Sequence, residues 1–256
     1  MEHADRFTVL LAEDDPATSI LARINLEKLG LGVRLAQNGK EALEIWRSGG
    51  YTVLLLDFNM PRMSGLDVAR AIRADEAARK SGTRTRIILI TAKPLDHLEE
   101  QQGRGVVDFM ALKPVNYHNI YSMIEDCIPS KSSPASPKTT EPESSKPLDL
   151  RELEDSVGAD GLRDILEVYI RQTEKYIMEI EDAIRLGDGA RVSSLAHKIK
   201  GSSAQFTANA LVGPATYLQN HCSTGNVDGA AEKLVAIKTA LGEVKKYVED
   251  QLGGGK

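Results

Sequence analysis

The sequence has 256 residues, of which 41% are hydrophobic and 27% are charged, and its net charge is -5. Neither half of the sequence is basic, which argues against a module that binds nucleic acid. No apolar stretch approaches the length of a membrane span, the N-terminus lacks signal-peptide character, and Cys127 and Cys222 match no metal-binding spacing. Composition therefore predicts a soluble cytoplasmic protein of one large domain or two ordinary ones, without nucleic-acid binding or membrane insertion.

The first half of the sequence alternates short apolar runs with amphipathic stretches. Strands are expected near residues 7–11, 32–36, 52–56, 87–91 and 107–112. Helices are expected near residues 16–29, 39–47, 64–80, 95–103 and 117–128. Pro16 and Ser64 suit helix starts, and Gly30 and Gly49 suit helix ends. Five repeats of strand and helix are typical of a doubly wound α/β fold, a parallel sheet with helices on both faces.

Polar side chains stand at the carboxyl ends of these expected strands. Glu13 and Asp14 follow the first strand, Asp57 follows the third, Thr91 closes the fourth, and Lys113 follows the fifth. Because the carboxyl ends of parallel strands share one edge of the sheet, these side chains are expected to converge. Three carboxylates at one place need a cation, and an all-oxygen site that also receives phosphate suits Mg²⁺.

The same residues predict a chemistry. Lys113 would pair with Asp57 or with an incoming phosphoryl group, and the Thr91 hydroxyl could donate a hydrogen bond to a phosphoryl oxygen. With the added charge neutralised, Asp57 can act as a nucleophile that becomes an aspartyl phosphate.

Residues 129–147 are rich in proline and serine and predict a linker between two domains. The sequence after it has no strand-like runs. Helices are expected near residues 149–156, 159–186, 189–205, 208–222 and 227–251, with breaks at 187–189, near Thr207 and at 224–226. Four substantial helices joined by short turns predict an all-α antiparallel four-helix bundle.

His197 occupies a distinctive place in the helix expected at 189–205. At 100° per residue, the apolar side chains gather on one face and His197 points away from it. The apolar face consists of Val192, Leu195, Ile199 and Phe206. Small residues and one lysine are expected beside His197 on an exposed face: Ser193, Lys200, Gly201 and Ala204. Such a face allows another protein to approach closely, and Lys200 could neutralise a phosphoryl group on the imidazole.

Residues 5–128 resemble the receiver domain of response regulators. The likeness rests on the acid pair, the strand-end Thr-Ala, the Lys-Pro pair and the Asp-x-x-Met-Pro-x-Met-x-Gly motif that begins at Asp57. The resemblance implies a flavodoxin-like five-stranded sheet of order 2-1-3-4-5 with Asp57 as the phosphoacceptor. It also implies that Mg²⁺ is bound by Asp14, Asp57 and the backbone carbonyl of Asn59, with help from Glu13.

The resemblance further implies that Thr91, Ala92 and Lys113 contact the phosphoryl group or switch in response to it. One position departs from the family pattern. Receivers usually carry an aromatic residue three positions before the lysine, whereas this chain has Met110. The aromatic switch is therefore not expected here, which suits a receiver that mainly relays phosphoryl groups.

Residues 148–252 resemble a histidine-containing phosphotransfer (HPt) domain through the sequence His-x-x-Lys-Gly-Ser-Ser that begins at His197. The resemblance implies that His197 is phosphorylated at Nε2 and supported by Lys200 and Gly201, and that Gln219 on the next helix holds the imidazole. The expected organisation is then a receiver at 1–128, a linker at 129–147, an HPt bundle at 148–252 and a flexible tail at 253–256.

Together these features predict a phosphorelay protein of a two-component system. Its receiver takes a phosphoryl group from a phosphohistidine of a sensor histidine kinase or another HPt protein, and His197 exchanges phosphoryl groups with an aspartate of this or another receiver. The sequence shows no kinase ATP-binding segment, so its only expected catalysis is phosphorylation and dephosphorylation of the receiver itself. The chain could also be the tail of a longer hybrid kinase.

Three alternatives remain open at this point. The receiver could regulate docking at the bundle without exchange between the two sites, or it could drain phosphoryl groups from a kinase by hydrolysis. A third alternative is an aspartyl phosphatase of the haloacid dehalogenase type. That family has a second acid two residues after its nucleophile, and this chain has Asn59 there.

Overall fold

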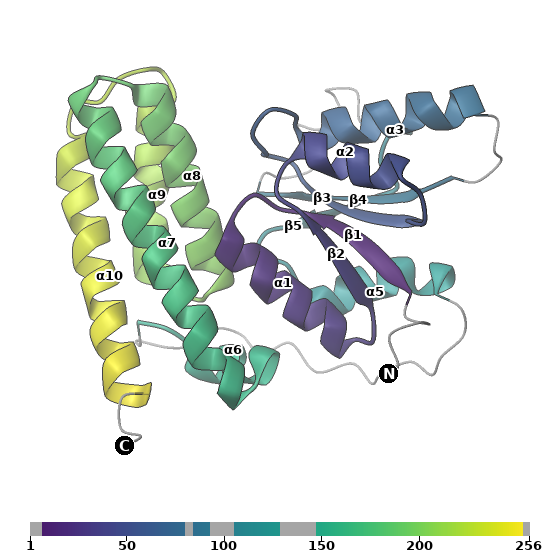
Figure 1. Cartoon of the computed structure of the whole chain (residues 1–256). Coiled ribbons are helices and arrows are strands. Elements are labelled where there is room, and N and C mark those ends of the chain that lie inside the picture. The colour runs from purple at the N-terminus through teal and green to yellow at the C-terminus, as the bar shows by residue number, and fades with distance from the viewer. Residues whose placement is uncertain (1–6, 80–83, 93–104, 129–146, 253–256) are drawn as a thin grey trace. The chain divides into compact units, whose positions relative to one another are not determined.

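The computed structural model describes residues 7–79, 84–92, 105–128 and 147–252 (Figure 1). The chain divides into two compact units, residues 1–139 and 140–256. The helix expected near 95–103, the linker apart from Pro147, and the tail at 253–256 lie outside the described residues. Among the residues described, no helix is long and apolar enough to cross a membrane.

The first unit is built on a five-stranded parallel sheet of order β2-β1-β3-β4-β5. Its strands are β1 (Thr8–Ala12), β2 (Gly32–Ala36), β3 (Val53–Asp57), β4 (Arg86–Thr91) and β5 (Phe109–Leu112). The three central strands are almost wholly buried, as their continuous apolar runs require of a sheet covered on both faces. The predicted fold and strand order are confirmed.

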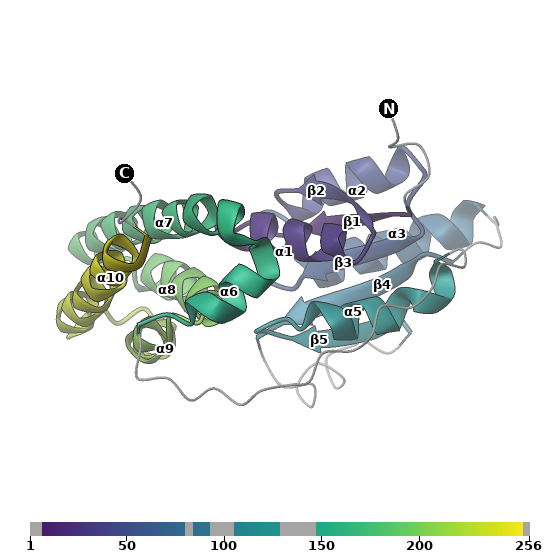
Figure 2. The ribbon, with the colours of Figure 1, turned by 90° about the horizontal axis from the view of Figure 1, so that it is seen from below.

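Helices cover both faces of this sheet (Figure 2). The described helices are α1 (Pro16–Lys28), α2 (Gly39–Arg47), α3 (Gly65–Arg79), α5 (Tyr117–Ile124) and the short 3-10 helix η1 (Glu125–Cys127). Side chains alternate along each strand, so that Leu11 and Leu55 pack with α1 and α5, whereas Leu10 and Leu54 pack with α2 and α3. This alternation gives the unit one core on each side of the sheet.

The predicted helix signals act as expected. Pro16 is the first residue of α1, behind an N-cap at Asp15 whose carboxylate accepts a hydrogen bond from the Thr18 amide. The Ser64 hydroxyl accepts a hydrogen bond from the Asp67 amide at the start of α3. Gly30 follows α1 with a φ of 85°, a left-handed conformation that suits glycine.

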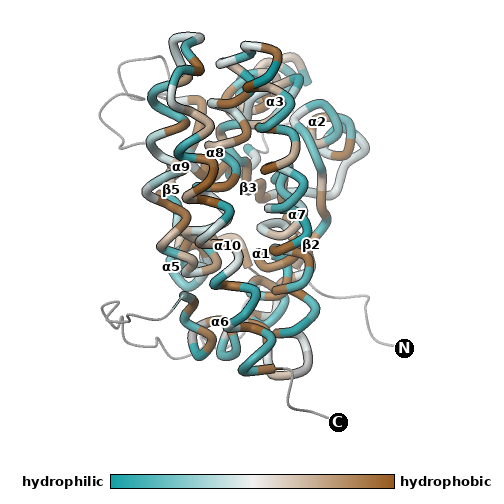
Figure 3. Tube along the Cα trace, turned by 90° about the vertical axis from the view of Figure 1, so that its left-hand side faces the viewer, coloured by the Kyte–Doolittle hydropathy of each residue, from teal (hydrophilic) through white to brown (hydrophobic). Residues whose placement is uncertain are grey.

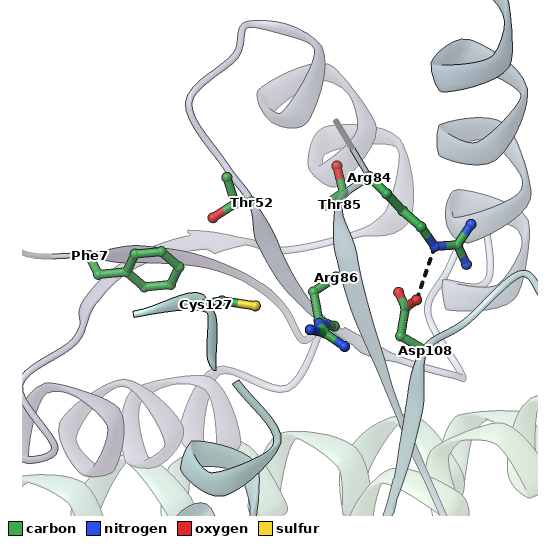
Figure 4. A pocket seen from close by; sticks show the side chains of 7 residues that line it. All are labelled: Phe7, Thr52, Arg84, Thr85, Arg86, Asp108 and Cys127. Atoms are coloured by element: carbon green, nitrogen blue, oxygen red, sulfur yellow. Dashed lines mark hydrogen bonds and ion pairs between the residues drawn. The ribbon is translucent and has the colours of Figure 1, made fainter. Parts of the chain in front are cut away.

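A partly buried ion network joins α3 to the amino edge of the sheet. The Arg73 guanidinium donates hydrogen bonds to Glu76 (2.7 Å), Asp108 (2.7 Å) and the carbonyl oxygens of Thr85 (2.9 Å) and Val106 (2.9 Å). Asp108 also pairs with Arg84 at 3.1 Å, beside a pocket that Figure 4 shows in close-up. The pocket is lined by Phe7, Thr52, Arg84, Thr85, Arg86, Asp108 and Cys127. Thr52 precedes β3, so the pocket lies at the end of the strands opposite to Asp57.

The second unit is all-α. It contains α6 (Leu150–Val157), α7 (Ala159–Arg185), α8 (Gly189–Gln205), α9 (Asn209–Cys222) and α10 (Ala230–Leu252), and the four longer helices form the predicted bundle. Ion pairs of Glu174 with Lys245 and of Glu181 with Lys238 show that α7 and α10 run antiparallel. Figure 3 shows hydrophobic and hydrophilic residues alternating along these helices, as one buried face per helix requires.

The breaks between these helices fall where the sequence predicted them, with one shift. Gly187, Thr207 and Gly225 all have a positive φ. The last helix begins at Ala230 and not near 227, because Asp228 donates its amide hydrogen to the Asn226 side chain in a turn and Gly229 has a φ of 72°.

Candidate functional site

Three carboxylates meet at the carboxyl edge of the sheet. Glu13 and Asp14 directly follow β1, and Asp57 is the last residue of β3. These strands are neighbours, with Ala12 opposite Leu56. One carboxylate oxygen from each of the three acids lies within 4.8 Å of the others. The structure therefore brings together the acids that the sequence predicted to converge.

Lys113 follows β5 and reaches two of these acids. Its Nζ lies 2.8 Å from Glu13 Oε2 and 3.1 Å from Asp57 Oδ1, and its side chain is only 11% exposed. The contact with Asp57 was predicted. The contact with Glu13 was not, because the sequence shows that both residues end strands but gives no distance across the edge.

Burial opposes the charged form of the acids at this site. Burial raises the pKa of Glu13 to about 8, although Lys113 partly opposes the shift, and burial likewise raises the pKa of Asp57. Burial also acts against the charged form of Lys113, but attraction to Glu13 and Asp57 outweighs it and raises the lysine pKa. Lys113 contacts two of the three clustered acids, Glu13 and Asp57, and the three carboxylates together fit a divalent cation that prefers oxygen ligands.

The remaining predicted residues of this half lie around the same edge. Thr91 ends β4 and is buried, and its neighbour Ala92 is partly buried. Asn59 is exposed in the segment after β3. Met110 is half-buried and packs on the core beneath α2 and α3.

Two residues of the site had no recognised role in the sequence. A Cβ atom at Gly65 would lie 2.3 Å from the carbonyl oxygen of Asp57, so only glycine lets α3 start against that strand end. Tyr117, the first residue of α5, is buried close enough to Glu13 that burial and this acid raise the tyrosine pKa. Gly65 is the last residue of the motif that begins at Asp57, so the sequence contained a signal for it. No motif in the sequence pointed to Tyr117.

In the second unit, α8 turns its apolar face inward as predicted. Its four predicted apolar residues, Val192, Leu195, Ile199 and Phe206, are buried. His197 and its predicted neighbours Ser193, Lys200, Gly201 and Ala204 are half-buried and not fully exposed. The prediction of an exposed face was therefore too simple. Because α8 packs against both α7 and α9, these helices partly bury the residues on its two sides.

The two lysines next to His197 differ in their surroundings. The Lys198 ammonium lies 5.6 Å from the ring centroid of Tyr176 on α7, a cation–π arrangement. Lys200 has no ion-pair partner within the part of the chain that the structure describes. A Cβ atom at Gly201 would meet no atom within 4 Å, so packing inside the bundle does not demand glycine there.

Gln219 lies on α9 opposite the turn that precedes His197. The Ser193 hydroxyl donates a 2.6 Å hydrogen bond to the backbone carbonyl oxygen of Gln219. Gln219 Oε1 is buried and has no hydrogen-bond partner among the described residues. The expected contact between Gln219 and the imidazole stays a prediction.

Comparison with known families gives one match for each unit. Residues 9–125 match the model of the response regulator receiver domain, and residues 164–247 match the model of the Hpt domain.

Two curated relatives align with most of the chain. It is 32% identical over 200 residues to the aerobic respiration control sensor protein ArcB of Escherichia coli (strain K12), an alignment that covers 76% of the chain and 25% of ArcB. It is 26% identical over 252 residues to the virulence sensor protein BvgS of Bordetella pertussis, which covers 91% of the chain and 20% of BvgS. The chain thus spans a quarter or less of the length of these relatives.

Solved structures align with about half of the chain. The response regulator TrrA of Thermotoga maritima in complex with Mg(2+)-BeF is 29% identical, with a TM-score of 0.42, and covers 48% of this chain and 99% of that one. A chain of the co-crystal structure of the Saccharomyces cerevisiae histidine phosphotransfer protein Ypd1 and the receiver domain of Ssk1 is 28% identical, with a TM-score of 0.42. The alignment covers 47% of this chain and 88% of that chain.

Proposed function

Because residues 9–125 form a response regulator receiver domain and residues 164–247 form an Hpt domain, we propose that this chain passes phosphoryl groups between Asp57 and His197. The observation that carries the proposal is the placement of Asp57 between an acid pair and Lys113 at one edge of a parallel sheet. In this proposal residues 1–128 act as the receiver, 129–147 as the linker and 148–252 as the HPt domain. The proposed location of the protein is the cytoplasm.

Mg²⁺ is the cation that this edge suits best. Asp14, Asp57 and the backbone carbonyl of Asn59 would hold it, with help from Glu13. Bound there, the ion supplies positive charge that offsets the carboxylates and the oxygens of the transferring phosphoryl group. The support for it is chemical: three carboxylate oxygens lie within 4.8 Å of one another, and Lys113 contacts two of these acids, Glu13 and Asp57.

Asp57 acts as the nucleophile of the first step. A carboxylate oxygen of Asp57 attacks the phosphorus of a donor phosphohistidine while the phosphorus–nitrogen bond breaks and its electron pair stays on the donor ring. Lys113 Nζ, already beside Asp57 Oδ1, would stabilise the charge on the phosphoryl oxygens. The Thr91 hydroxyl and the segment at Ala92 would contact the same oxygens from β4.

His197 acts as the acceptor or donor of the second step. In the forward direction, Nε2 of neutral His197 attacks the phosphorus of an aspartyl phosphate, and the aspartate carboxylate leaves with the bonding electrons. The imidazole keeps its other proton, so the product ring is positively charged. Lys200 lies one turn after His197 and would attract the phosphoryl oxygens, and Gly201 leaves open space for an approaching receiver.

The proposed partners are proteins that carry a phosphorylated histidine or an acceptor aspartate. Asp57 receives its phosphoryl group from a sensor histidine kinase or an HPt protein, and His197 exchanges with Asp57 or with the aspartate of another receiver. The curated relatives ArcB and BvgS are named as sensor proteins, and the chain aligns with only part of each. This fits a module that works within, or next to, such a kinase.

Phosphorylation of Asp57 can be tested without a partner. We expect the His197→Ala chain, incubated with acetyl phosphate and Mg²⁺, to acquire one base-labile phosphate, because the receiver supplies the nucleophile and the charge stabilisation itself. The label should disappear in Asp57→Ala and when a chelator removes the metal. Asp75→Ala, which changes an acid of α3 paired with Arg47, should keep the label. Equal labelling of the Asp57→Ala chain would refute the role of Asp57.

A further inference from the structure

A buried hydrogen bond connects α7 to the helix that carries His197. The hydroxyl groups of Tyr169 on α7 and Ser203 on α8 lie 2.8 Å apart, and both side chains are fully buried. Inside a bundle core such a bond has no competition from water, and removal of one partner leaves the other without its bond. The pair therefore restrains α8 more specifically than apolar packing alone can.

Ring contacts extend this restraint along the same interface. The Tyr169 ring stacks on Phe206 with centroids 4.5 Å apart and an angle of 13° between the planes. Tyr176, two turns further along α7, has Lys198 of α8 over its ring. Two tyrosines of α7 thus contact α8 immediately after His197, at Lys198, and about two turns later, at Ser203 and Phe206.

The opposite flank of α8 is held from α9. Ser193, one turn before His197, donates its hydroxyl hydrogen to the carbonyl oxygen of Gln219 at 2.6 Å. The two polar contacts, at Ser193 and at Ser203, lie on either side of His197 along the helix and come from different neighbouring helices. Together they fix the rotation of α8 about its own axis.

The rotation of α8 matters because Nε2 of His197 must approach the phosphorus atom from the side opposite the leaving oxygen. An atom about 6 Å from a helix axis moves by about 1 Å when the helix turns by about 10°. A misplacement of about 1 Å can cost roughly 100-fold in the rate of a reaction that depends on alignment.

The adjacent serine provides a built-in contrast. Ser202 is also buried, but its hydroxyl donates to the Lys198 carbonyl oxygen at 2.9 Å, within α8 itself. Of these two neighbouring hydroxyl groups, Ser203 alone bonds to α7 in the described contacts. Substitution of either serine by alanine removes one hydroxyl group. Only the substitution of Ser203 removes the hydrogen bond between α7 and α8.

We propose that Tyr169 and Ser203 are positioning residues for phosphoryl transfer: their hydrogen bond sets the rotation of α8 and thereby aims the His197 imidazole. The inference rests on the proposed role of His197. It assigns the second serine of the His-x-x-Lys-Gly-Ser-Ser sequence to alignment, and it adds a residue of α7 that lies 28 positions before the histidine (197 minus 169).

Transfer kinetics between two forms of the full chain test this proposal. The donor is the His197→Ala chain phosphorylated on Asp57, and the acceptor is the Asp57→Ala chain carrying Tyr169→Phe, Ser203→Ala or Ser202→Ala. We expect the first two acceptor variants to lower kcat on the order of tenfold while KM changes less than about twofold. The double variant Tyr169→Phe/Ser203→Ala should be no slower than either single variant. Ser202→Ala should transfer at the reference rate.

A second readout does not need any transfer. The ring carbon–proton NMR signals of His197 should shift in Tyr169→Phe and Ser203→Ala and stay in place in Ser202→Ala. If the reference Asp57→Ala chain accepts no phosphate, transfer between separate chains has failed, and these NMR signals decide the positioning role alone. Equal kcat in Ser203→Ala and Ser202→Ala, or unmoved His197 signals in both Tyr169→Phe and Ser203→Ala, would overturn the inference. A lowered melting temperature without either change would show a role in stability only.

Discussion

Replacing Lys113 by methionine is expected to slow phosphorylation of Asp57 by acetyl phosphate about 100-fold, the usual effect of removing one preorganised donor at a developing charge. The Lys113 ammonium contacts both Asp57 and Glu13, two of the three clustered carboxylates. Methionine preserves most of the side-chain volume and removes the charge. The rate of appearance of base-labile phosphate at saturating Mg²⁺ measures the effect.

A surface lysine of the same unit supplies the control. Lys40 pairs loosely with Glu44 at 3.9 Å, and its side chain is 70% exposed. Lys40→Met should therefore label at the rate of the unchanged protein. If Lys113→Met labels within about twofold of that rate, Lys113 does not stabilise the transferring group, and its contact with the acids is structural.

Replacing Arg73 by methionine is expected to destabilise the first unit by about 3–5 kcal/mol, the range measured when one partner of a buried charge pair is removed. The Arg73 side chain is 13% exposed and donates hydrogen bonds to four acceptors, which lie on α3 and in the segments just before β4 and β5. Without it, Glu76 and Asp108 would each lose a cationic partner, and the carbonyl oxygens of Thr85 and Val106 would lose their donor. Urea unfolding followed by the fluorescence of Trp46, which lies in this unit, measures the loss.

Arg70 provides a matched comparison on the same helix. It pairs with Asp67 at 3.2 Å, but the two side chains are 40% and 50% exposed, so Arg70→Met should cost less than about 1 kcal/mol. A similar, small loss for both variants would show that the Arg73 network adds little to stability.

The parts of this protein that could be predicted from sequence are those that local patterns determine. The third strand was expected at 52–56 and spans Val53–Asp57, and α8 spans the expected 189–205, because apolar runs and helix periodicity are continuous along the chain. The meeting of Glu13, Asp14 and Asp57 was also predictable, since a parallel sheet places all strand ends on one edge.

The rest depends on contacts that local patterns do not encode. The network around Arg73 joins residues from 73 to 108 that follow no period, and the bond between Tyr169 and Ser203 connects two helices whose rotation only packing decides. The half-buried state of His197 arises in the same way, from the helices on either side of α8. The sequence predicted the side chains proposed to react, and the tertiary structure was needed to find the residues around them.

One comparison tests the exchange between Asp57 and His197 most directly. The unchanged chain, Asp57→Ala and His197→Ala are each incubated with acetyl phosphate and Mg²⁺, and the bound phosphate is classified as base-labile aspartyl phosphate or acid-labile phosphohistidine. We predict acid-labile phosphate in the unchanged chain that is absent from both variants, with base-labile phosphate kept in His197→Ala. Acid-labile phosphate that persists in Asp57→Ala, or never forms in the unchanged chain while Asp57 is fully labelled, would contradict exchange between the two sites.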